Sequence, residues 1–297
     1  IFDSLNLPFS REKITPVRVA EGWKEEERWE IFNKIVAQVN DNDEIYFDMT
    51  HSFRYLPMLA IIALNYIRVV KKNIKIRGIY YGAFEALGPA YQVKVLPIEQ
   101  RKAPVIDLIS FENLMRWTAG VDRFIGTGDA SILSGLVKEK ELSEGSPEKR
   151  LVENMEEFGK IMATCRGRKI GEGAKAVKAS IEGFKVSLGK DRKPGLSPLV
   201  HLLGKIEDKM KGFADDDIKN GLEAVKWCIE HNMTQQGYTI LREIVVTWLA
   251  KRHYGNKNEI YDERRRDTFS NGLFVISKDI PEEEWRLTEK NKKKVRE

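Results

Sequence analysis

The sequence predicts an α/β domain followed by an all-helical domain, and three observations support this fold class. A chain of 297 residues is long enough for two separate cores. Two short runs rich in β-branched and aromatic residues enclose an apolar segment of helical length between residues 44 and 81. After residue 108, polar caps and apolar helical periods follow one another without a further convincing strand.

The first domain is predicted to contain a parallel crossover. A helix is expected within residues 20–40, where the apolar residues fall on one stripe: Trp23, Ile31, Phe32, Ile35, Val36 and Val39. A strand over Glu44–Asp48, a helix over Phe53–Val70 and a strand over Ile74–Tyr81 follow. This order predicts a right-handed parallel pairing of the two strands. The segment Tyr91–Leu96 is expected to form a third strand.

The second domain is predicted to be a succession of helices. We place the first domain at residues 1–105 and the second at residues 106–297. Because the chain begins at Ile1 and not at Met, a further amino-terminal part of the first domain is left open. Helix starts are indicated by polar caps, two of them followed by proline: Ser110, Asp129, Ser146, Ser197 and Thr234. The last of these helices is expected to bury Tyr238, Leu241, Val245, Trp248 and Leu249. Beyond Gly255 the chain becomes polar, which predicts a mobile or partner-dependent tail.

Composition excludes several classes of protein. With 42% hydrophobic and 32% charged residues the chain is predicted to be globular and soluble. A formal charge of +5 creates no overall field that demands a nucleic-acid partner. Cys165 and Cys228 lack metal-ligand spacing, so we expect no zinc site or other metal, no disulfide framework and a reducing cytoplasm. The longest apolar run, Leu56–Leu64, is too short to span a bilayer, so no membrane role is expected.

The end of the first strand carries the most informative residues. Ionisable and small polar side chains crowd there immediately before the apolar helix: Asp48, Thr50, His51, Ser52 and Arg54. At the carboxyl end of a strand in an open α/β sheet, backbone N–H groups and the next helix favour anionic ligands. The functional interpretation is a phosphate or nucleotide pocket, to which Arg54 adds a charge-assisted contact. The alternative is a plain helix start that Asp48 or Ser52 caps.

The stretch Asp48–Pro57 resembles the Asp-x-Thr-His-Gly motif, with its trailing Phe-Arg and Pro, of a family of CRISPR-associated proteins. Ser52 stands where that motif has Gly, and its hydroxymethyl group either narrows the approach of a ligand or adds a hydrogen bond. Residues Ile79–Glu85 and Trp227–Glu243 resemble the same family. The likeness covers most of the chain.

The resemblance implies a Rossmann-like CARF sensor domain followed by an all-helical HEPN ribonuclease domain. It implies a homodimer that binds cyclic oligoadenylate, made by type III CRISPR complexes, across its two-fold axis as an allosteric activator, with no cofactor. Carried over to this chain, the pocket contains Asp48, Thr50, His51, Ser52 and Arg54. Tyr81 and Gly82 at the end of the next strand are further candidates. For His51 we favour ligand contact over a helix-start hydrogen bond.

The catalytic residues of the implied ribonuclease are unknown. The HEPN motif is Arg, four to six residues, then His, and none of the four histidines (His51, His201, His231 and His253) follows an arginine at that distance. We favour a motif in a segment outside this sequence over a degenerate nuclease. Arg242 and Glu243 are weak candidates for lining the groove, and an exposed ion pair is the alternative. For Arg264–Arg266 a solvated face is favoured over RNA phosphate contact.

The resemblance therefore implies a dimeric endoribonuclease that cleaves single-stranded RNA without metal when cyclic oligoadenylate binds. Two alternatives stay open. One is a sensor that detects the ring and passes the signal on without cleaving RNA, and the other is a sensor that also degrades its ligand.

Overall fold

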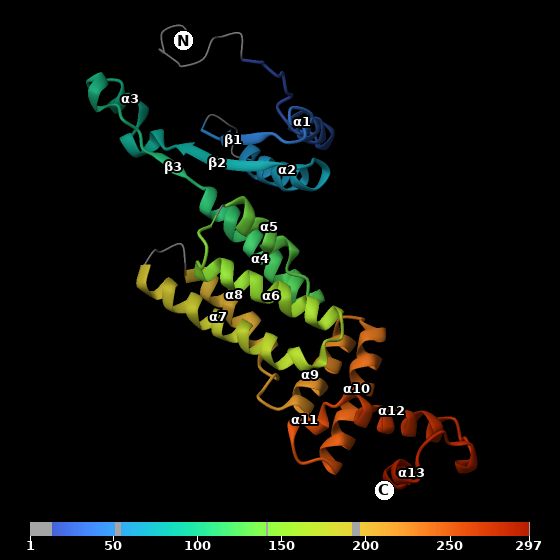
Figure 1. The fold of residues 1–297 in the computed structure, drawn as a ribbon. Helices are drawn as coiled ribbons and strands as arrows, with labels where there is room; N and C mark the ends of the chain where they lie inside the picture. Colours follow the sequence, from blue (N-terminus) through green and yellow to red (C-terminus); the bar gives the residue numbers. More distant parts are fainter. Residues whose placement is uncertain (1–13, 51–54, 141, 192–196, 297) are drawn as a thin grey trace. The chain divides into compact units, whose positions relative to one another are not determined.

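The structure is a computed structural model, which describes residues 14–50, 55–140, 142–191 and 197–296. The chain divides into two compact units, Ile1–Glu112 and Asn113–Glu297. The first is α/β and the second contains only helices among its described residues, which confirms the predicted fold class (Figure 1). The first unit ends at Glu112, whereas the limit predicted from the sequence is residue 105. The domain limits stay a prediction.

The first unit is a small mixed sheet with helices packed on it. Its elements are α1 (Glu25–Ala37), β1 (Glu44–Asp48), α2 (Leu56–Val70), β2 (Lys75–Gly82), η3 (Phe84–Leu87), α3 (Ala90–Val93), η4 (Ile98–Gln100) and β3 (Val105–Asp107). The strand order is β1-β2-β3; β1 and β2 are parallel, as predicted, and β3 runs antiparallel to β2. Apolar residues of α1 and α2 join Ile45, Phe47 and Ile76 of the strands in one core.

Two expectations for this unit are wrong. Residues Tyr91–Leu96 do not form a strand, because Pro89 opens the short helix α3, where the Val93 N–H donates to the Pro89 carbonyl at 3.1 Å. The third strand lies instead at Val105–Asp107. Trp23 precedes α1 and is 71% exposed, so it takes no part in the buried stripe.

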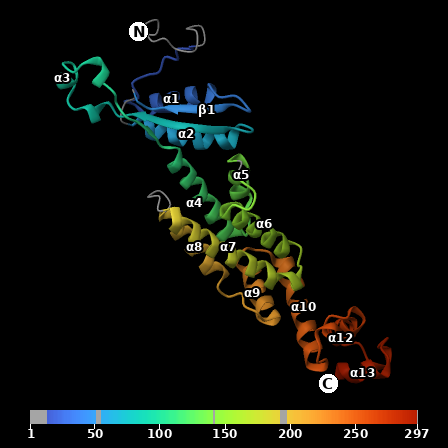
Figure 2. The ribbon, with the colours of Figure 1, turned by 60° about the vertical axis from the view of Figure 1, so that its left-hand side comes forward.

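The second unit is built from helices along its whole described length. They are α4 (Ile109–Thr127, which begins before the division), α5 (Ser131–Glu139), α6 (Pro147–Ala163), η5 (Gly167–Lys169), α7 (Ile170–Asp191), α8 (Ser197–Met210), α9 (Asp217–Glu230), α10 (Thr234–His253), α11 (Lys257–Ile260), α12 (Glu263–Ser277), η7 (Glu282–Glu284) and α13 (Glu289–Arg296). The predicted cap Ser146 accepts a hydrogen bond from the Lys149 N–H at 3.4 Å. Helices α6 and α7 lie side by side in both views (Figure 1 and Figure 2).

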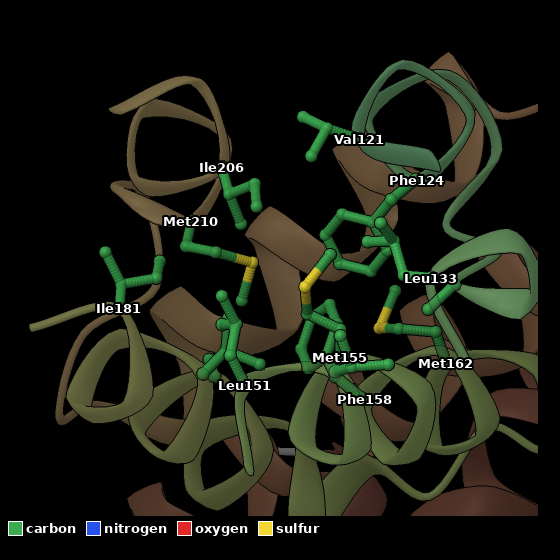
Figure 3. Packing of buried hydrophobic residues seen from close by; sticks show 14 of the residues in the cluster. Val121, Phe124, Leu133, Leu151, Met155, Phe158, Met162, Ile181, Ile206 and Met210 are labelled. Atoms are coloured by element: carbon green, nitrogen blue, oxygen red, sulfur yellow. The ribbon is translucent and has the colours of Figure 1, made fainter. Parts of the chain in front are cut away.

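One continuous core holds α4 to α10 together. Figure 3 shows part of it, with Phe158 of α6 among Leu151, Met155 and Met162. The Phe158 ring lies edge-on to Phe213 and to Trp227, with centroids 5.3 Å away in both cases. Such edge-to-face pairs stabilise a core beyond the area that they bury.

Helix α10 buries a different face from the one predicted. Ile240, Ile244 and Ala250 are buried, whereas Tyr238 is 72% and Trp248 46% exposed. The reason is the close approach of α9. A Cβ on Gly221 would lie 2.4 Å from Ile244 Cγ1, so the small residue on α9 admits the side of α10 that carries Ile244. Sequence periodicity alone does not choose between two partly apolar faces.

The segment after Gly255 is folded over its described residues, which corrects the expectation of a mobile tail. Ile260 and Phe269 pack with Val246 and Ala250 of α10 in a separate small core. The Lys294 ammonium of α13 donates to the Tyr254 hydroxyl at 2.6 Å. This polar segment folds because its few apolar residues, Ile260 and Phe269 among them, pack on the side of α10 that carries Val246 and Ala250.

Candidate functional site

The carboxyl ends of β1 and β2 meet at one edge of the sheet because the strands are parallel. Asp48 lies opposite Tyr80 in the register, and the Met49 N–H donates to the Tyr80 carbonyl at 3.0 Å. The pairing therefore continues one residue beyond Asp48 and places Thr50 beside the end of β2.

Thr50 joins the two strand ends through its hydroxyl group. Asp48 Oδ1 accepts hydrogen bonds from the Thr50 N–H at 2.8 Å and from the Thr50 O–H at 2.5 Å. Thr50 Oγ1 in turn accepts from the Gly82 N–H at 2.7 Å. The structure thus brings Asp48, Thr50 and Gly82, three of the predicted ligand residues, into one hydrogen-bonded group, called the strand-end group below.

Gly82 allows this contact because it has no side chain. A Cβ at this position would lie 3.1 Å from both Cγ2 and Oγ1 of Thr50, tighter than ordinary van der Waals contact. The next residue, Ala83, donates its N–H to the Pro104 carbonyl at 2.9 Å and so anchors the end of β2 toward β3. The close approach explains why glycine suits this point of the edge.

Comparisons with known proteins agree with the order of the two units. The family model described as CRISPR system endoribonuclease Csx1, CARF domain, matches residues 21–85, which include the strand-end group. The model described as CRISPR-associated protein MJ1674, second domain, matches residues 113–234 of the helical unit. Both matched models describe CRISPR-associated proteins, and the first of them is a CARF domain. The resemblance stated from the motifs is thereby confirmed.

A curated relative supports the same family. The CRISPR-associated protein MJ1674 of Methanocaldococcus jannaschii is 26% identical over 238 residues, which cover 80% of this chain. The same residues cover 33% of the relative, so the chain spans about a third of the length of the curated relative that it matches.

Within the range that matches the CARF model, Tyr81 is hydrogen-bonded to Glu85, which is not among the ligand residues predicted from the sequence. Its hydroxyl donates to Glu85 Oε1 at 2.5 Å, and its ring packs partly against the sheet core. This hydrogen bond raises the pKa of Tyr81 and is the main cause that lowers the pKa of Glu85.

Replacing Tyr81 with Phe is expected to return the pKa of Glu85 toward its ordinary value near 4.5, because the hydrogen bond to the carboxylate is lost. In the wild-type domain the bond is fully present above pH 4.5 and is lost as the pH falls through the lowered pKa of Glu85. Carboxyl carbon NMR titration of Glu85 in both proteins measures the difference. An unchanged titration curve would show that Tyr81 does not hold this carboxylate in solution.

The other three predicted ligand residues, His51, Ser52 and Arg54, lie outside the described residues. Their ligand contacts therefore stay predictions. The ligand roles of Asp48, Thr50, Tyr81 and Gly82 are predictions as well, although the structure gives the arrangement of these four.

The two weak catalytic candidates in the helical unit bind different groups of α12. Arg242 donates to Ser270 Oγ at 2.6 Å, and Glu243 forms an ion pair with Arg266 at 2.7 Å. Both therefore help to hold α12 on α10. Glu243 is in an ion pair, although with Arg266 of another helix, whereas Arg242 donates to a hydroxyl group. A catalytic role for either stays a prediction.

The described part of the chain contains neither a cluster of metal-ligating residues nor a helix suited to crossing a membrane. No group of three or more His, Cys, Asp or Glu residues there could hold a metal ion. None of the helices in these residues combines the length and the apolar character needed to cross a membrane.

Proposed function

We propose that this chain is a type III CRISPR accessory protein that senses cyclic oligoadenylate through its CARF domain. The observation that carries the proposal is the strand-end group, which lies at the carboxyl edge of parallel strands inside the range that matches the CARF model. This is the edge at which open α/β sheets bind ligands.

The chemistry of the edge suits such a ligand. A cyclic oligoadenylate carries phosphodiester groups, ribose hydroxyls and adenine rings, so it needs hydrogen-bond donors and acceptors beside a cation. Thr50 supplies a hydroxyl, and Asp48 fixes the orientation of that hydroxyl by accepting a hydrogen bond from it. The neighbouring His51, Ser52 and Arg54 belong to the same segment of sequence and would add donors for phosphate and adenine.

We further propose that the bound ring activates metal-independent cleavage of single-stranded RNA by the helical unit, acting as a HEPN domain. The matched CARF domain is that of a CRISPR system endoribonuclease, which supports this. Cleavage needs a base for the 2′-hydroxyl and a cation for the charged phosphorane. Since no arginine and histidine stand at the motif spacing, a sensor without ribonuclease activity is the second candidate function.

A homodimer is part of the proposal. Tyr238, Leu241 and Trp248 form an apolar stripe along α10 that is exposed in the single chain. Contiguous exposed apolar surface of this kind is typical of protein interfaces. This stripe supports pairing of two helical units, alongside the pairing of two CARF domains around one ring.

The deciding experiment measures ring binding and RNA cleavage separately in the same full-length protein. A labelled single-stranded RNA is incubated with and without cyclic tetra-adenylate or cyclic hexa-adenylate, in the presence of a chelator. The expected result is cleavage with one ring size only, unaffected by the chelator. Binding without RNA cleavage would favour the sensor alone, and linear products from the ring would show ligand degradation. If neither ring binds, the proposed function is wrong.

A further inference from the structure

A cavity in the helical unit, lined by both charged and apolar side chains, is not explained by the proposed sensor. It has a volume of about 180 Å³ and is lined by residues of η5, α9, α10 and the segment at the start of α12. Six of its polar lining residues matter here: Arg168, Asp217, Glu243, Thr247, Tyr261 and Arg266. A water molecule takes about 30 Å³ of liquid volume, so the cavity is large enough for a phosphate group.

Tyr261 is the central side chain of this cavity. Its hydroxyl donates to Asp217 Oδ2 at 2.5 Å, so that carboxylate already has a partner. Burial first, and then this hydrogen bond, raise the pKa of Tyr261 to about 12, so the phenol is neutral and donates at physiological pH. The guanidinium carbons of Arg168 and Arg266 lie 4.6 Å and 5.8 Å from the centre of its ring.

Arg266 is a fixed and neutralised cation. It donates to Thr247 Oγ1 at 2.9 Å and to Glu243 Oε2 at 2.7 Å, and its side chain is only 13% exposed. The Glu243 carboxylate, the second one in the cavity, is therefore paired with a cation. Asp217 keeps its negative charge, because its partner Tyr261 is neutral, so the group left to bind an anion is Arg168.

Arg168 has donors left over. Its Nη2 donates to the Tyr261 carbonyl at 2.7 Å, and among the described residues no carboxylate lies within ion-pair distance of it. The same holds for Arg166 and Lys169, which flank it in the sequence and are exposed. Three cations within four residues, without a described acidic partner, give this side of the cavity a positive potential.

We propose that this cavity binds a phosphate group, with Arg168 as its principal ligand. Stacking on Tyr261 holds the guanidinium plane in place, and a planar guanidinium with free N–H groups recognises phosphate oxygens in a bidentate way. Arg166 and Lys169 add longer-range attraction. The phosphate belongs either to a single-stranded nucleic acid or to a free nucleotide, and this site is separate from the strand-end group.

The test compares two charge reversals that change the net charge equally. Arg168→Glu removes the principal ligand, whereas Arg150→Glu alters an exposed arginine near the start of α6 that does not line the cavity. The probes are fluorescent decauridylate, uridine monophosphate and inorganic phosphate, with the full chain. Thermal melting of both variants checks that they are folded.

Arg168→Glu is expected to weaken binding about tenfold or more and to reduce the slope of log affinity against log salt by about one. Arg150→Glu should change affinity less than about twofold. Binding of decauridylate alone identifies a strand, and equal binding of the monophosphate, or competition by inorganic phosphate, identifies a free phosphate source. Equal losses in both variants, or no binding of any probe to the wild type, would overturn the proposal. Changing Thr50 should leave these affinities unaltered, which separates this site from the sensor.

Discussion

Replacing Thr50 with Val should weaken the binding of cyclic oligoadenylate by about a hundredfold. Valine has nearly the same shape, yet it lacks the hydroxyl group. The Gly82 N–H then loses its acceptor, and Asp48 Oδ1 loses the hydrogen bond from the Thr50 O–H. Two hydrogen bonds are lost, one of them to a charged group, and together they are worth about 3 kcal/mol. They are also present in the free protein, so their loss lowers affinity because the ring must then order the edge itself, at a cost of about a hundredfold when the whole ~3 kcal/mol has to be restored. The edge then no longer presents Asp48 and Gly82 in one arrangement.

Thr50→Ser is the matched control because it keeps the hydroxyl group and loses only a methyl group. Its affinity should stay within about fivefold of the wild type, a difference of about 1 kcal/mol. Dissociation constants for labelled cyclic tetra- and hexa-adenylate, measured on all three proteins, decide the matter. If Thr50→Val binds as tightly as the wild type, the strand-end group is not part of the ligand site.

Replacing Phe158 with Ala should destabilise the helical unit by about 3–5 kcal/mol. The side chain is fully buried in α6, and its ring contacts those of Phe213 and Trp227. Truncation leaves a cavity where α6, α9 and the segment between α8 and α9 converge, and the rigid neighbouring rings cannot close it. Urea unfolding followed by circular dichroism at 222 nm measures the loss in free energy of unfolding.

Phe274→Ala in α12 is the control for this change, because it deletes the same atoms from a ring that is 54% exposed. It should cost less than about 1 kcal/mol. Comparable losses for the two variants would mean that the core around Phe158 is looser in solution than the structure shows.

Much of the first unit follows from local sequence. The strand over Glu44–Asp48 was predicted with its observed bounds, and so was the parallel pairing of the two strands that α2 connects. The reason is that alternating and continuous apolar patterns are strong signals when a strand and a helix are each long enough to show their period. The three residues of β3 are too few to show one.

The three residues of the strand-end group were all predicted from sequence, but the side-chain pairing beside them was not. Asp48, Thr50 and Gly82 were chosen because strand ends and family motifs pointed to them. The pairing of Tyr81 with Glu85 was not foreseen, since a hydrogen bond between two side chains depends on how the chain turns after β2. Sequence indicates which residue types gather, and the turn decides which atoms meet.

By itself the sequence determined that an α/β unit precedes a helical one. It also indicated the strand end at which the predicted ligand residues lie. Only the tertiary structure decided which face of α10 is buried and that Arg168, Tyr261 and Arg266 share one cavity. Both depend on contacts between segments far apart in the chain: Gly221 admits Ile244, and the Arg168 guanidinium reaches Tyr261 across more than ninety residues. Local periodicity carries no record of such contacts, because it reports which faces are apolar and not which partner covers them.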